Sequence, residues 1–215
     1  MPDLALATPL WLAVLGIAVN ALVGALHAYT DDHRPWDVVG VLSFALLMGL
    51  GGGVVRDLLL GQLPPLSLRS PLGVVTVVAA AAAGRLVVPL ILRAARLMAV
   101  LEALALALFA ISGAAYADAA GLPWTTSVLV AVVAAVGGGV LVSLLRGEVP
   151  SVLQAGRPDA LLAAWAALAY LLLDDVSTAA ASIVPLALAV GVRLLSDRRS
   201  LATRPLSRAA TAPLA

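Results

Sequence analysis

The chain has 215 residues, of which 62% are hydrophobic and 12% are charged, and its mean hydropathy is +1.07. A soluble domain carries about a quarter of its residues as charged side chains, so this composition excludes a soluble globular protein and predicts one that resides in lipid. The formal net charge of +1 gives no argument for nucleic-acid binding, and the lack of cysteine excludes disulfides, thiol nucleophiles and thiolate metal sites.

Clusters of polar and turn-forming residues divide the chain into seven apolar segments, and we expect each segment to form a helix. Because a membrane-spanning helix needs about 20 apolar residues, seven helices leave only short loops and no separate soluble domain. In chain order, the predicted helices are Leu10–Tyr29, Val38–Leu60, Pro71–Leu92, Leu97–Ala117, Trp124–Leu145, Ala160–Leu173 and Thr178–Leu195. An Arg-rich tail, residues 196–215, follows them.

The loops differ in their content of arginine, which predicts the orientation of the chain. Basic loops remain in the cytoplasm, and an N-terminus outside the cell leaves only Arg69 on the outer side. The arginines then placed on the cytoplasmic side are Arg34, Arg93, Arg96, Arg146, Arg157, Arg198, Arg199, Arg204 and Arg208. We therefore expect a multi-pass protein with its N-terminus outside and its C-terminal tail in the cytoplasm, against lipid headgroups.

The sequence contains an internal repeat. Residues 51–64, GGGVVRDLLLGQLP, recur 86 residues later as residues 137–150, GGGVLVSLLRGEVP. Each repeat holds three predicted helices, and an odd number makes the second repeat enter the membrane from the opposite side. The sequence thus predicts an inverted repeat, with units at 10–92 and 97–173 and one extra helix at 178–195. This architecture is typical of transporters and channels, whose pathway forms near the membrane midplane.

Each repeat carries three successive glycines inside a predicted helix. They are Gly51, Gly52 and Gly53 in the second helix and Gly137, Gly138 and Gly139 in the fifth. Each glycine weakens a helix by up to about 1 kcal/mol relative to alanine, which favours a kink or unwound turn whose freed carbonyl groups line a wet pathway. The alternative is that the glycines only permit close contact between helices.

Polar side chains within the predicted helices are few, and five of them are candidates for the pathway. They are Arg56, Asp57, Ser43, Thr76 and Ser143. Ionisable residues in a spanning segment are costly and often functional, although the first two lie close enough to a helix end to form an interfacial ion pair instead. Both interpretations stay open for this pair.

Other chemistry finds little support in the sequence. Glu102 is placed either in an interfacial salt bridge with Arg96 or in the lumen. The two histidines lack acidic partners at ligand spacing, so we expect no metal site. The sequence shows no paired carboxylates and no nucleophile with a neighbouring base, and we expect neither an enzyme nor a cofactor.

The doubled glycine segments, the FAISGA run at 109–114 and the three-plus-three-plus-one layout together resemble the prokaryotic trimeric intracellular cation channel family, which was earlier given a suggested glycine-transporter role. The resemblance covers about residues 10–196. It implies an inner-membrane homotrimer with a pore in each protomer, lined by kinked second and fifth helices, that conducts potassium or sodium and contacts lipids. It also implies that Arg56 and Asp57 are the family's charged pair, which Val142 and Ser143 do not repeat in the second unit.

Two functions follow from this sequence. The first is a passive channel for monovalent cations, mainly potassium, in which backbone carbonyls and hydroxyls replace part of the ion's water. The second is a secondary transporter of a small amino acid such as glycine, bound at helix ends beside the breaks. Both need the same broken helices, so the sequence does not separate them.

Overall fold

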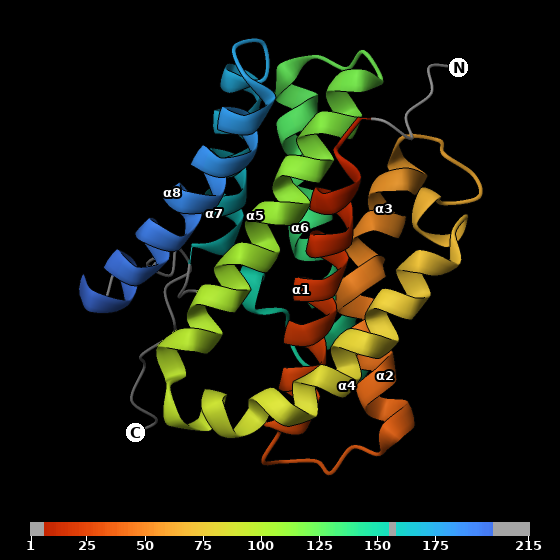
Figure 1. Cartoon of the computed structure of the whole chain (residues 1–215), viewed down its shortest axis with the longest axis vertical. Helices are drawn as coiled ribbons and strands as arrows, with labels where there is room; N and C mark the ends of the chain where they lie inside the picture. Colours follow the sequence, from red (N-terminus) through yellow and green to blue (C-terminus); the bar gives the residue numbers. More distant parts are fainter. Residues whose placement is uncertain (1–6, 155–157, 200–215) are drawn as a thin grey trace, which may run out of the picture.

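The computed structural model of the protein describes residues 7–154 and 158–199, and this part of the chain is a bundle of helices without strands (Figure 1). One turn of π-helix, Leu47–Gly51, joins α2 to α3, and short 3-10 turns at Leu66–Leu68 and Ser151–Leu153 lie in two of the loops. The helices are α1 (Leu10–Tyr29), α2 (Val38–Leu46), α3 (Gly52–Leu59), α4 (Pro71–Arg93), α5 (Ala95–Ala119), α6 (Trp124–Arg146), α7 (Asp159–Leu173) and α8 (Thr178–Arg199).

The seven predicted helices are confirmed, because α2, the π-helical turn and α3 together form the second span, Val38–Leu59. Six of the spans are long and apolar enough to cross a membrane, whereas α7 is apolar but has only 15 residues. Every helix end lies within two residues of its predicted position except that of α8, which continues to Arg199. Residues 196–199 of the predicted tail are thus helical. Arg157 and the rest of the tail, 200–215, lie outside the described residues.

Local signals in the sequence account for several of these ends. The carboxylate of Asp37 accepts a hydrogen bond of 2.8 Å from the backbone N–H of Gly40 and caps α2. The hydroxyl of Ser70 caps α4, whose first residue is a proline. Gly147, with φ of +70°, terminates α6 in the left-handed conformation that glycine adopts without strain.

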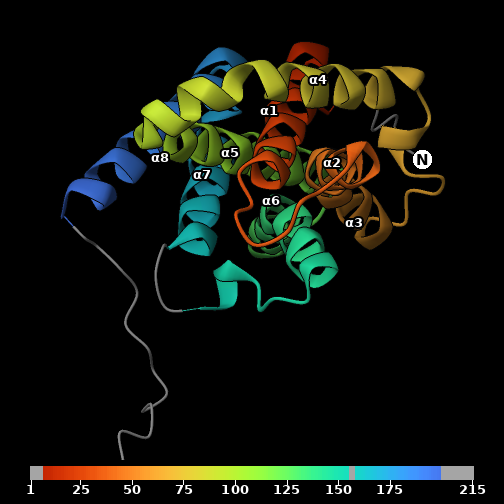
Figure 2. The same ribbon diagram turned by 90° about the horizontal axis from the view of Figure 1, so that it is seen from below.

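The two helices that begin the repeats, α1 and α5, pack against each other in the centre of the bundle. Helix α1 also contacts α2 and α4, and α5 also contacts α6, α7 and α8. Figure 2 looks along the bundle and shows α4 on one side of α1 and α6 on the other. The central position of α1 and α5 explains why α5 is the most buried of the long spans.

The predicted unwound turns at the glycine triplets are not found. Gly51 and Gly52 have helical backbone angles, with φ of −58° and −61°, and the second triplet lies within the uninterrupted helix α6. The irregularity in the second span precedes α3, where the π-helical turn Leu47–Gly51 changes the hydrogen-bond register. The glycines therefore do not serve to free backbone carbonyl groups, and the prediction of kinks is not confirmed.

Candidate functional site

The two glycine triplets lie against each other where the second span crosses α6. A Cβ atom on Gly52 would collide with the carbonyl oxygen of Ala134, and a Cβ on Gly138 would lie 2.8 Å from the carbonyl oxygen of Met48. A Cβ on Gly137 would lie 3.4 Å from the Cα of Gly52. At Gly52 and Gly138 the two backbones approach too closely for a side chain, whereas a Cβ on Gly137 would make ordinary van der Waals contact. Close contact between helices is the alternative interpretation that the sequence left open.

The third glycine of each triplet has different surroundings, because it faces a cavity. Among the described residues, a Cβ on Gly53 or on Gly139 would meet no atom closer than 4.0 Å. Gly139 lines a cavity of about 470 Å³ that also contains Glu102, and we call it the Glu102 cavity. Gly53 lines a cavity of about 830 Å³ that contains Arg56, which we call the Arg56 cavity.

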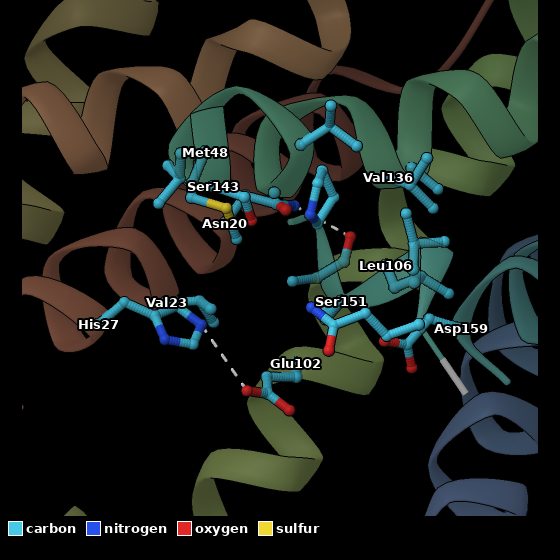
Figure 3. Close-up of a pocket in the computed structure, with 18 of the residues that line it drawn as sticks. Asn20, Val23, His27, Met48, Glu102, Leu106, Val136, Ser143, Ser151 and Asp159 are labelled. Carbon is cyan, nitrogen blue, oxygen red and sulfur yellow. Dashed lines mark hydrogen bonds and ion pairs between the residues drawn. The ribbon is translucent and has the colours of Figure 1, made fainter. Parts of the chain in front are cut away.

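The Glu102 cavity is bounded by α1, α5, α6, α7 and the loop after α6. Figure 3 shows Asn20 and Ser143 on its wall, with His27 and Glu102 facing each other across one side. The Nε2 atom of His27 lies 3.7 Å from Oε1 of Glu102. The second carboxylate oxygen of Glu102 lies 2.7 Å from an Arg193 nitrogen, so that this wall is charged rather than apolar.

The loop after α1 is attached to the end of α6 beside this cavity. The NH2 atom of Arg146 lies 3.3 Å from Oδ2 of Asp31 and 3.1 Å from Oε1 of Glu148. The indole N–H of Trp36 donates a hydrogen bond of 2.8 Å to Oδ2 of Asp31. This hydrogen bond, together with those from the following backbone N–H groups and the charge of Arg146, holds the pKa of Asp31 below its usual value of 3.8, against the opposing effect of burial. Asp31 is therefore a fixed negative charge at this end of the bundle.

The Glu102 cavity and the Arg56 cavity lie at opposite ends of α1 and α5, and the Arg56 cavity is also lined by α3. The guanidinium of Arg56 donates from Nε and NH2 to Oδ1 of Asp57, at 2.8 and 2.6 Å, and from NH1 to the hydroxyl of Ser112. Its Cζ atom lies 3.9 Å from the ring centre of Tyr116. The other Asp57 oxygen accepts a hydrogen bond of 2.8 Å from the backbone N–H of Leu66. The Arg56–Asp57 pair is thus buried and built into the cavity wall, with Asp57 fully enclosed.

The two cavities end less than one helical turn apart. On α1, Asn20 lines the Glu102 cavity and Ile17 lines the Arg56 cavity, and these residues are about 4.5 Å apart along the axis. In the π-helical turn, the adjacent Met48 and Gly49 line different cavities. Among the described residues, none lines both.

A ring that lines the Arg56 cavity and an amide that lines the Glu102 cavity stand where the two cavities approach each other, and they are the candidate barrier between them. Carbon atoms of the Phe109 ring lie within 3.4 Å of where Cβ atoms of Gly16 and Gly52 would stand, so the ring fills the space between α1 and α3. The side-chain amide of Asn20 donates hydrogen bonds of 2.9 Å to the carbonyl oxygens of Gly16 and Ala105, which ties α1 to α5 at the same level.

The structure thus divides the eleven residues predicted from the sequence. Two hydroxyl residues line neither cavity: Ser43 donates a hydrogen bond of 2.8 Å to the carbonyl oxygen of Val39, and Thr76 lies on α4. Four of the predicted residues line a cavity: Gly53, Arg56, Gly139 and Ser143. Four lie at the helix crossing: Gly51, Gly52, Gly137 and Gly138. The last, Asp57, forms an ion pair with Arg56.

Two residues of the site were missed. Arg193 is an ionisable residue inside the last predicted helix, and its position alone was a signal, because charges within spans are costly. Phe109 lies in the FAISGA run, but nothing in the sequence distinguished a barrier from ordinary core packing.

Comparisons with known proteins find relatives by sequence and by fold. The family model described as glycine transporter matches residues 10–89 and 99–175. The UPF0126 membrane protein of Deinococcus radiodurans is 35% identical over 157 residues, which cover 73% of this chain and 71% of that protein. A chain solved to explain conductance through TRIC cation channels superposes with a TM-score of 0.79 at 28% identity, covering 92% of this chain and 96% of its own. The trimeric intracellular cation channel orthologue from Rhodobacter sphaeroides gives 0.78 at 27% identity, covering 89% and 97%.

Proposed function

The chain belongs to the trimeric intracellular cation channel family, and on that premise we propose that it conducts monovalent cations, mainly potassium, through the two cavities of a single protomer. The observation that carries the proposal is the arrangement of these cavities. They lie toward opposite ends of the bundle, and their walls end less than one helical turn apart, at the crossing of the glycine triplets.

The charge of the Glu102 cavity favours cations. Among the described residues, its wall holds three carboxylates, from Glu102, Glu148 and Asp159, against two guanidinium groups, from Arg146 and Arg193. This leaves a surplus of one negative charge when His27 is neutral. A cavity with low-dielectric walls raises the local concentration of ions of opposite sign, and the hydroxyl of Ser143 and the amide of Asn20 offer oxygens to a partly dehydrated ion.

Conduction along this route requires the barrier to open. The ring of Phe109 has to leave the gap between Gly16 and Gly52, and the amide of Asn20, which binds the carbonyl oxygen of Gly16, faces the Glu102 side. The adjoining π-helical turn, Leu47–Gly51, provides a place where the second span changes its register without unfolding.

The assembly and orientation are part of the same proposal. We expect a homotrimer in a prokaryotic inner membrane, surrounded by lipid, with the N-terminus outside and the Glu102 cavity open to the cytoplasm. The arginine distribution supports this orientation, and the solved relative from Rhodobacter sphaeroides is a trimeric channel. Since ions are conducted and not transformed, no catalytic residue is proposed.

Reconstitution into liposomes tests the function. Vesicles that contain the protein should release potassium down its gradient faster than protein-free vesicles, and planar bilayers should show unitary current steps. Absence of flux from vesicles with correctly assembled protein contradicts the proposal. Saturable glycine uptake that is stimulated by glycine on the opposite side, without current steps, would instead establish the transporter alternative.

A further inference from the structure

Arg193 holds two acidic side chains together on the wall of the Glu102 cavity. Its NH1 atom lies 2.6 Å from Oδ1 of Asp159, at the start of α7, and its NH2 atom lies 2.7 Å from Oε2 of Glu102, on α5. Its side chain, which comes from α8, is 5% exposed. Figure 3 shows Glu102 and Asp159 on the same side of the cavity. One fixed cation thus bridges two carboxylates that face the proposed ion pathway.

A divalent cation could bind at the position that the guanidinium occupies. The two terminal nitrogens of a guanidinium are held in a rigid fork, so the carboxylate oxygens they bind lie close together. Calcium binds carboxylate oxygens at about 2.3–2.6 Å, so that a single ion joins oxygens up to about 5 Å apart. Without Arg193, the described part of the wall would hold three carboxylates against Arg146, which doubles its negative surplus from one charge to two.

We propose that Arg193 is a specificity-determining residue that occupies, as a tethered cation, the position at which a divalent cation would bind between Glu102 and Asp159. The inference rests on the proposed function, because it explains how the acidic Glu102 cavity stays free of bound divalent cations and open to monovalent ions. Arginine suits the task better than lysine because its guanidinium stays charged at every physiological pH and binds both carboxylates at once.

A purely structural ion pair would not need this geometry. A buried ion pair is often replaced by apolar residues without loss of stability, and α8 is otherwise an apolar span. The Nε atom of Arg193 is buried and has no hydrogen-bond partner among the described residues, which is an energetic cost at this position. The position of the Arg193 side chain therefore favours its contacts with two carboxylates over a hydrogen bond for every one of its N–H groups.

Calcium binding to the detergent-solubilised full chain, measured by equilibrium dialysis at pH 8, tests the inference. R193Q should bind calcium at least ten-fold more tightly than the wild type, and the double variant E102Q/R193Q should return to the wild-type affinity. The matched control is R96Q, which removes one positive charge from an exposed position on α5 and should leave calcium affinity unchanged. In vesicles, millimolar calcium should inhibit potassium flux through R193Q and not through R96Q.

The outcomes separate this inference from the proposed function. An assembled R193Q protein that binds calcium no better than the wild type overturns the inference, whatever the potassium flux. A wild-type protein without flux overturns the channel, yet leaves the calcium measurement valid. If R193Q does not assemble, R193K takes its place: a lysine bridges two carboxylates less completely, so calcium affinity should rise several-fold, and an unchanged affinity refutes the proposal.

Discussion

Neighbouring glycines of the same triplet should respond in opposite ways to the same substitution. A Cβ on Gly52 would collide with the carbonyl oxygen of Ala134 and lie 2.9 Å from Cδ2 of Phe109, whereas the nearest atoms to a Cβ on Gly53 are 4.0 Å away, on Ser67. The variant G52A therefore has to force α3 away from α6. The variant G53A adds the same methyl group without a collision.

Replacing glycine by alanine within a helix gains up to about 1 kcal/mol, and both variants have this gain because both positions lie in α3. Overpacking a close contact costs about 1–3 kcal/mol, and only G52A bears this cost. The two variants have identical composition, yet their free energies of unfolding should differ by about 1–3 kcal/mol, from the overpacking alone. The second triplet repeats the contrast with G138A and G139A.

Thermal unfolding in detergent, followed by the loss of the assembled species on size exclusion, measures this difference. We expect G52A and G138A to unfold below the wild type, and G53A and G139A to unfold at or above its temperature. Equal stability of G52A and G53A would refute the close crossing as the reason for the triplets. A general need for flexible backbone would then be the better explanation, because it treats all three glycines alike.

Three further predictions concern the barrier, the buried pair and the acidic loop. F109A should raise basal potassium flux by joining the two cavities, and an assembled F109A protein with unchanged flux would place the barrier elsewhere. D57N should destabilise the fold by about 3–5 kcal/mol, because it leaves a buried guanidinium without its counter-charge, whereas D118N, at an exposed position, should have little effect in the same denaturation assay. The lowered pKa of Asp31 stabilises the fold above its usual value of 3.8, and the effect disappears as the pH falls through the lower folded value. W36F should therefore lower the unfolding temperature at pH 6, and its deficit should shrink below pH 3.8; a deficit independent of pH would show that only packing was lost.

The positions of the helices were predictable because lipid imposes a simple rule on sequence. Each span has to satisfy its backbone internally and present apolar side chains, so charge and turn clusters mark its ends, as at Asp37 and Gly147. The continuation of α8 past Leu195 was not predictable in this way. Its last residues are polar, and hydropathy alone cannot tell a helical extension from a loop.

The role of the glycines was harder to predict because one local sequence serves two different surroundings. Three glycines weaken a helix in isolation, but Gly52 and Gly138 are held in helical conformation by the opposing backbone, which they approach across 86 residues of sequence. Arg193 presents the same difficulty, since its partners come from α5 and α7. Tertiary contacts of this kind leave no local pattern.

The inverted repeat explains how the cavities share one construction and differ in charge. In each repeat the first two glycines lie at the helix crossing, and the third lines a cavity. Gly53 lines the Arg56 cavity, and Gly139 lines the Glu102 cavity. The positions that follow break this symmetry, because Arg56 and Asp57 correspond to Val142 and Ser143. The second repeat therefore supplies no charged pair at these positions. The charge of its cavity comes instead from Glu102, Arg146, Glu148 and Asp159 elsewhere in the same repeat, and from Arg193 of α8, which binds both Glu102 and Asp159.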